Sequence, residues 1–176
     1  KAYIVSSALG IKLLIGADLH VVDPIDEERH HELCLLAQNE AGYHNLMVLL
    51  SRAYQQGQYL GRPRVRLDWA RDHAQGLIAL SGGRQGDIGQ ALLHGRDSDA
   101  HAALTRWLEW FPMRFYLEIQ RTGRADEEDY LHAVVALAGD YDCPVVATND
   151  VRFMEAEEFE AHEARVCIGD GRTLDD

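Results

Sequence analysis

The chain has 176 residues, of which 47% are hydrophobic and 26% charged, a composition typical of a globular domain and unlike that of disordered or coiled-coil segments. Its formal net charge is −12, from 29 Asp and Glu against 17 Lys and Arg, so we expect no basic surface that binds DNA through its phosphates. No apolar run approaches the roughly 18 residues of a membrane span, and the start lacks the layout of a signal peptide, so we expect a cytoplasmic protein with no membrane contact.

Strands and helices alternate along the predicted chain. Short apolar runs rich in β-branched residues indicate strands, and longer stretches with apolar residues at i, i+3, i+4 and i+7 indicate helices. In chain order, we expect a strand at Lys12–Val22, a strand at Glu32–Ala37, a helix at Glu40–Arg52, a strand at Gly76–Ser81, a helix from the N-cap Ser98 up to Pro112, a strand at Phe115–Arg121, a helix from the cap Asp126 up to Gly139, a strand at Pro144–Thr148 and a helix at Ala156–Cys167.

The strand sequences favour an α/β fold with a parallel sheet. The runs Leu77-Ile78-Ala79-Leu80 and Val145-Val146-Ala147-Thr148 do not alternate with polar residues, which is typical of strands that helices cover on both faces. Such a sheet is either open or closed into a barrel, and periodicity does not choose between the two. The loop Gln55–Arg66 is polar, basic and punctuated by Gly and Pro, so we expect a surface excursion inside a single domain.

Polar residues at the ends of the predicted strands are the candidate site residues, because sites in parallel α/β domains collect there. They are Asp18 and His20, Ser81-Gly82-Gly83, Gln120-Arg121-Thr122 and Thr148-Asn149-Asp150. Asp150 is the most telling of them, since a carboxylate in this place is typical of sites that handle divalent metals and phosphates. The alternative, an Asn149-Asp150 turn that caps the next helix, stays open.

Common local metal and catalytic motifs are missing from the sequence. The nine histidines include no H-x-H and no H-E-x-x-H, and only His20, at the end of a strand, and His162, in the helical segment after Asp150, are candidate ligands. The stretch from Gly82 to Gly86 matches neither the P-loop nor the dinucleotide fingerprint, so it predicts an anion cradle only weakly. The three cysteines form no C-x-x-C pair, which favours reduced core thiols at Cys34, Cys143 and Cys167.

Five stretches of the sequence, taken in order, are similar to stretches of a known protein family. They are Ile15–Asp18, Leu35–Leu46, Gly76–Gly83, Phe115–Arg124, and Pro144–Phe153 followed by Glu160–Glu163. Together they resemble the PHP domain of bacterial DNA polymerase III alpha subunits over nearly the whole chain. The resemblance implies a distorted (βα)7 barrel, incomplete here, with residues 1–176 forming one domain that lacks the first strand and its His-x-His segment.

The resemblance also implies a zinc or manganese centre in metal-binding members of the family. Asp18 corresponds to an acidic ligand that is usually Glu, and the Asp of the Asn-Asp pair is kept as Asp150. The other ligand positions are changed. Glu32 stands where the family has a His, with His31 one position before it, and Gly83 stands where the family has a Cys. Thr122 and Arg152 stand where the family has two further His residues.

These replacements favour a site without metal. Gly83 has no side-chain donor, Thr122 offers only a neutral hydroxyl, and Arg152 brings a permanent positive charge. We therefore expect no catalytic residue and no cofactor in this fragment. We hypothesise that the Arg152 guanidinium takes the place of metal charge beside the remaining carboxylates, and the alternative is that it points to solvent.

Three functions are consistent with this resemblance. The first is a structural PHP domain within a DNA-directed DNA polymerase of the polymerase III holoenzyme. This domain would stabilise the polymerase and dock the separate proofreading exonuclease subunit. DNA would be bound by the rest of the full-length chain. The second is a metal-dependent phosphoesterase or 3′–5′ exonuclease, with zinc or manganese held by Asp18, His20, Glu32, Asp150 and His162. The third, a stand-alone phosphatase related to histidinol phosphatase, is disfavoured by the polymerase-type stretches.

Overall fold

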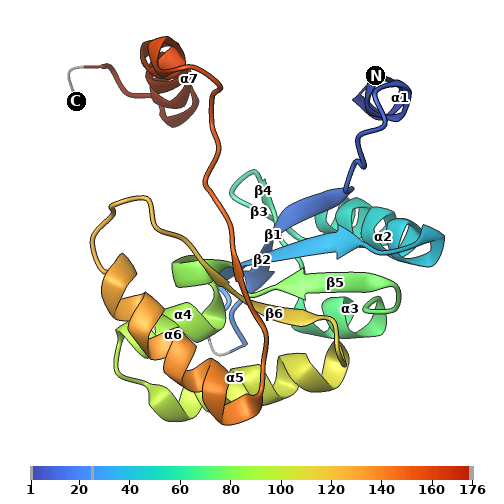
Figure 1. Ribbon diagram of the computed structural model, residues 1–176, viewed down its shortest axis with the longest axis vertical. Coiled ribbons are helices and arrows are strands. Elements are labelled where there is room, and N and C mark those ends of the chain that lie inside the picture. Colours follow the sequence, from blue (N-terminus) through green and yellow to red (C-terminus); the bar gives the residue numbers. More distant parts are fainter. Residues whose placement is uncertain (1, 25, 175–176) are drawn as a thin grey trace.

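The computed structural model describes residues 2–24 and 26–174, which form a mixed α/β fold (Figure 1). The strands are β1 (Gly16–Val22), β2 (His30–Ala37), β3 (Gln58–Tyr59), β4 (Arg62–Pro63), β5 (Leu77–Leu80), β6 (Phe115–Ile119) and β7 (Val145–Ala147). The helices are α1 (Ala2–Ala8), α2 (Glu40–Gln56), α3 (Leu67–Asp72), α4 (Asp87–Leu93), α5 (Asp97–Trp110), α6 (Glu127–Tyr141) and α7 (Phe159–Asp170), with short 3-10 turns at Gly83–Gln85 and Ala156–Glu158.

The main sheet has five strands in the order β1-β2-β5-β6-β7. The pairs β5–β6 and β6–β7 are parallel, as predicted, but β1–β2 and β2–β5 are antiparallel. The prediction of a parallel sheet is therefore wrong for β2, which runs opposite to the other four strands. A short loop joins β1 directly to β2, whereas a parallel pair would need a long crossover. Closure into a seven-stranded barrel stays a prediction.

Several predicted boundaries differ from the structure. The first strand begins at Gly16 and not at Lys12, and the apolar side chains just before it are exposed. Ser98 lies inside the first turn of α5 because the N-cap position falls on Arg96. Asp126 does occupy the N-cap position of α6, but its backbone is left-handed and its side chain makes no capping bond.

Other elements were not foreseen in the sequence. The helices α3 and α4 were missed because each spans only six or seven residues, too few for a clear period. The predicted loop Gln55–Arg66 contains the β3–β4 hairpin. Helix α6 runs past Gly139 to Tyr141, and the last predicted helix is split between the turn at Ala156–Glu158 and α7.

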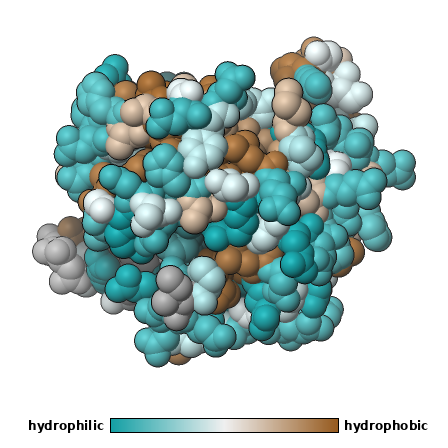
Figure 2. Space-filling model, turned by 90° about the horizontal axis from the view of Figure 1, so that it is seen from below, coloured by the Kyte–Doolittle hydropathy of each residue, from teal (hydrophilic) through white to brown (hydrophobic). Residues whose placement is uncertain are grey.

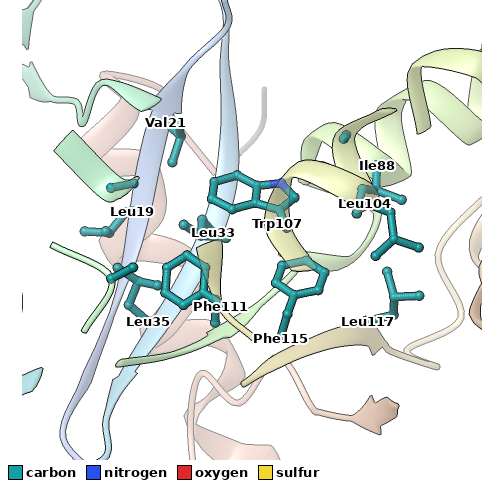
Figure 3. Packing of buried hydrophobic residues seen from close by; sticks show 14 of the residues in the cluster. Leu19, Val21, Leu33, Leu35, Ile88, Leu104, Trp107, Phe111, Phe115 and Leu117 are labelled. Carbon is teal, nitrogen blue, oxygen red and sulfur yellow. The ribbon is translucent and has the colours of Figure 1, made fainter. Parts of the chain in front are cut away.

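Among the described residues, one hydrophobic core joins β1, β2, β5 and β6 to the helices α2 to α6, and Figure 3 shows part of it. Leu19 and Val21 of β1 alternate with polar residues and face it, as do Leu33 and Leu35 of β2. They pack against the buried aromatic side chains of Trp107, Phe111 and Phe115. Because side chains alternate along a strand, the other face of β1–β2 carries Asp18, His20, Glu32 and Cys34 and forms one wall of the site.

The surface is mostly hydrophilic where it is seen from below, and hydrophobic residues show through only in small groups (Figure 2). Helices α1 and α7 stand away from the rest of the molecule on separate connecting segments (Figure 1). Within residues 2–24 and 26–174, the structure contains no helix with the length and apolarity to span a bilayer.

Candidate functional site

A polar cavity of about 540 Å³ lies where the polar face of β1–β2 meets the carboxyl ends of β5, β6 and β7. Four acidic side chains line it, together with three arginines that stand in loops after the parallel strands. The lining acids and arginines are Asp18, Glu32, Glu118, Asp150, Arg84, Arg124 and Arg152. The place agrees with the prediction that polar residues gather at strand ends, although Asp18 and His20 lie within β1 and not after it.

The β1–β2 wall supplies carboxylates and one thiol. Asp18 lies opposite Cys34 in the register, and His20 lies opposite Glu32. Burial raises the pKa of Glu32, and the nearby negative charges of Asp18 and Glu118 add to this effect. Burial also raises the pKa of Cys34 to about 12.

Glu118 is a buried carboxylate that the sequence analysis missed. It is 7% exposed within β6, and its carboxylate accepts a hydrogen bond from the Thr148 hydroxyl at the end of β7. The Gln120 side chain donates to Thr148 Oγ1 at 3.2 Å, and the Glu118 backbone N–H donates to the Ser81 hydroxyl at 2.9 Å. The sequence signal was a single charged residue inside the apolar run from Phe115 to Ile119.

Asp150 is held between two guanidinium groups. Its Oδ2 is 2.6 Å from Arg124 Nη2, and its Oδ1 is 2.5 Å from Arg152 Nε. The Asp150 side chain is only 15% exposed, whereas the arginine side chains are more than half exposed. Desolvation opposes ionisation, but hydrogen bonds from Arg124 and Arg152 outweigh it and lower the pKa of Asp150. The carboxylate is therefore charged and already neutralised by the protein.

The loop that carries Arg124 is fixed by Glu127 at the start of α6. The Glu127 carboxylate accepts hydrogen bonds from the Thr122 hydroxyl at 2.6 Å and from the backbone N–H groups of Thr122, Gly123 and Arg124 at 2.7, 2.8 and 3.2 Å. Arg84 adds a bond of 2.6 Å to the Ala125 carbonyl oxygen. Glu127 thus fixes the backbone from which Arg124 reaches Asp150. The Thr122 hydroxyl is already hydrogen-bonded to the Glu127 carboxylate.

The glycines after β5 form a tight turn. Gly82 and Gly83 both have positive φ, of 73° and 56°. A Cβ atom on Gly82 would lie 2.2 Å from the Glu32 carbonyl oxygen, so only glycine fits against β2. Gly83 begins a single 3-10 turn, and this turn brings Arg84 and Gln85 to the cavity.

The predicted site residues are only partly gathered. Asp18, Glu32, Asp150 and Arg152 line the cavity, whereas Gly83 and Thr122 lie beside it in the adjoining turns. His20 packs edge-on against His30, with ring centroids 4.5 Å apart. His162 lies on α7, where it contacts Phe153 and Arg165. Arg124 and Glu127 were missed, and no local sequence pattern distinguishes them from other charged loop residues.

The donor set does not fit a zinc or manganese ion. Among residues 2–24 and 26–174, no group of three or more His, Cys, Asp or Glu is arranged to hold a metal. Asp150, the Asp kept from the metal-binding pattern, is already paired with two guanidinium groups. Such a site can hold charge and hydrogen bonds in place, but it offers no ligand cluster for activating water.

Comparison with known proteins agrees with this architecture. Residues 1–122 match the PHP domain family. Over all of its length the chain is 50% identical to the DNA polymerase III subunit alpha of Pseudomonas aeruginosa and 49% identical to that of Escherichia coli K12, and over 95% of its length it is 48% identical to that of Haemophilus influenzae. The chain spans about 15% of the length of the first two relatives and 14% of the third.

Replacing Glu127 by Gln is expected to destabilise the fold at neutral pH. The hydrogen bond from the Thr122 hydroxyl, helped by the backbone N–H groups, holds the pKa of Glu127 below its ordinary value of 4.5. Because the pKa of Glu127 is lower in the folded state than in the unfolded state, its ionised carboxylate stabilises the fold above pH 4.5. This stabilisation is lost as the pH falls through the folded-state pKa. Urea midpoints measured between pH 3 and pH 7 should therefore depend less on pH in E127Q than in the parent chain.

The matched control is Glu128→Gln, one residue further along the chain. Glu128 pairs with Arg121 through two hydrogen bonds, but both side chains are more than half exposed, and surface pairs contribute little. An equal or larger loss of stability in E128Q would show that the loop does not depend on Glu127.

Proposed function

The chain belongs to the PHP domain family, and on this basis we propose that it is part of the alpha, or polymerase, subunit of a bacterial DNA polymerase III, in which it serves chromosomal replication as a metal-free structural domain. In this proposal the full-length protein is a DNA-directed DNA polymerase of the cytoplasm. Nucleotidyl transfer and DNA binding belong to the larger part of the polypeptide, since relatives of this kind are more than six times as long as the chain.

The observation that carries the structural role is the double ion pair on Asp150. A divalent ion at this place would neutralise several carboxylates at once, and two guanidinium groups supply equivalent charge without leaving an open coordination position. Arg152 alone was the substitute expected from the sequence, and Arg124 strengthens the hypothesis because it approaches the second oxygen of the same carboxylate.

Glu118 also has a partner within the protein, since the Thr148 hydroxyl donates a hydrogen bond to its carboxylate. Burial raises the pKa of Glu32, which favours its neutral form more than in water. The Glu118–Thr148 bond joins β6 to the end of β7, and the Arg124–Asp150 ion pair joins the segment after β7 to the loop before α6. We infer that the former metal position now connects elements that a metal ion would otherwise hold together.

Docking of a proofreading exonuclease subunit is a second part of the proposal. Its support is the similarity of the whole chain to DNA polymerase III alpha subunits, since the resemblance to that family implies such a partner. A domain without a metal centre of its own is compatible with hydrolysis by a separate subunit.

Removing both arginines should destabilise the domain, whereas a chelator should not. In the variant Arg124→Ala/Arg152→Ala the Asp150 carboxylate, 15% exposed, loses both counter-charges, which we expect to cost on the order of 2 kcal/mol of unfolding free energy. The control Arg121→Ala breaks an exposed pair and should cost less than about 1 kcal/mol. Urea unfolding with and without EDTA measures both effects. A midpoint that falls in EDTA, or an unchanged midpoint in the double variant, would contradict the structural role.

Exchanging the domain tests exonuclease docking. The complete alpha subunit should bind the immobilised exonuclease subunit, and a chimera whose PHP domain comes from a stand-alone PHP phosphatase should lose most of that binding while it keeps primer extension. Equal exonuclease binding by the chimera would rule out docking on this domain and leave only the stabilising role.

A further inference from the structure

One stretch of this acidic chain without an acidic residue is longer than any other. Residues 41–67 include no Asp or Glu, although the whole chain has 29 of them, and they include four arginines. The arginines are Arg52, Arg62, Arg64 and Arg66. The segment forms nearly all of α2 and the whole β3–β4 hairpin, and the helix contacts both strands of the hairpin. It therefore presents one continuous surface that differs in charge from the rest of the molecule.

Helix α2 has a second apolar stripe, which is largely exposed to solvent. Its core-facing side is made by Gly42, Leu46, Leu49 and Ala53. Tyr43, Met47 and Tyr54 stand at i, i+4 and i+11, which places them on one line along a different side of the helix. They are 43%, 49% and 62% exposed. A helix that served only to cover the sheet would need only the first stripe.

The hairpin adds an apolar residue in a strained backbone conformation. Tyr59 pairs with Arg62, so the loop between the strands is Leu60-Gly61, and both of these residues have positive φ, of 49° and 79°. Two-residue loops of this type favour Asn, Asp or Gly at the first position, because a bulky side chain is strained there. The Leu60 side chain is 87% exposed, so no burial within the described chain offsets the strain.

The hairpin is nevertheless firmly anchored. The Arg64 guanidinium lies 4.0 Å from the centre of the Tyr59 ring and donates a hydrogen bond of 2.6 Å to the Glu27 carbonyl oxygen. The next residue, Val65, bonds to the backbone of β1 on both sides, donating to His20 and accepting from Val22. Because the hairpin backbone is anchored, little backbone freedom is lost when a partner covers Leu60, which favours binding.

Arg62 is the cation that this surface offers to a partner. Arg64 is buried beneath Tyr59, Arg66 pairs with Asp68, and Arg52 stacks on Trp69. Arg62 is exposed and forms no salt bridge within residues 2–24 and 26–174. It stands next to Leu60 and Gly61 at the hairpin tip.

We propose that the surface formed by residues 41–67 docks an acidic protein segment whose apolar side chains cover Tyr43, Met47, Tyr54 and Leu60 and whose carboxylate pairs with Arg62. Tyr, Met and Arg are enriched in protein interfaces, and the exposed apolar side chains supply the anchors. A partner of this charge is repelled by the remainder of the molecule, whose net charge is strongly negative, so it is directed to the acid-free surface. Nucleic acid fits less well, because a single free guanidinium is a poor match for a phosphate backbone.

Photo-crosslinking in cells tests this proposal on the complete polypeptide that contains the chain. Benzoylphenylalanine placed at Tyr54 or Leu60 should crosslink to the same partner segment, and mass spectrometry of the crosslinked peptide should show acidic residues interspersed with apolar ones. The control position is Val135 on α6, which is 47% exposed on a different element and should not capture that segment.

A charge exchange then tests the predicted contact itself. Arg62→Glu should lower the crosslinking yield from Leu60 about tenfold, and changing the facing carboxylate of the partner to Lys should restore it. Arg165→Glu, an exposed change on α7, should have no effect. Crosslinks to nucleic acid or to a second copy of this chain, the absence of any crosslink, or a yield that R62E leaves unchanged would each overturn the proposal.

Discussion

The pairing of one carboxylate with two guanidinium groups is the constraint on which the site depends. Asp150 follows β7, Arg152 follows it on the same segment, and Arg124 comes from the loop between β6 and α6. This contact joins chain segments that are 26 residues apart in sequence, at the edge of the sheet where parallel strands end. Its geometry depends in turn on Glu127, which binds three successive backbone N–H groups and fixes the loop that Arg124 occupies. The site is thus built from charge that the protein supplies itself.

The two faces of the β1–β2 pair explain how this polar site coexists with a stable core. Leu19, Leu33 and their apolar neighbours pack on the aromatic cluster around Trp107, and the alternate residues Asp18 and Glu32 face the cavity. Because the core residues and the cavity-facing residues lie on opposite faces of these strands, the polar wall of the cavity does not interrupt the packing of the core. The acid-free surface on α2 and the hairpin is a separate feature, directed outward and not toward the cavity.

Local sequence patterns predicted the elements well where apolar spacing was regular. The α2 and α5 helices and the five strands of the main sheet were recognised from their apolar patterns, and Asp150 from its place after a buried strand. Arg152 was identified only through the resemblance to the PHP domain. Strand direction was not predictable, because the apolar run in β2 reads the same in a parallel or an antiparallel pair. Arg124, Glu127 and Glu118 were missed for a different reason. Their roles arise from contacts between loops and strand ends that come together only in the folded chain, and neither a charged loop residue nor a single acid in a strand indicates such a contact by itself.

The central claim is that arginine side chains occupy the place of a metal ion beside Asp150. Crystals of the complete alpha subunit grown with manganese, with diffraction recorded on both sides of the manganese absorption edge, test it most directly. We expect no anomalous peak within bonding distance of Asp150 and clear density for the Arg124 and Arg152 guanidinium groups on its two oxygens. A fully occupied ion bridging Asp150 and Asp18, with Arg152 turned away, would contradict the account and favour a hydrolytic domain in its place.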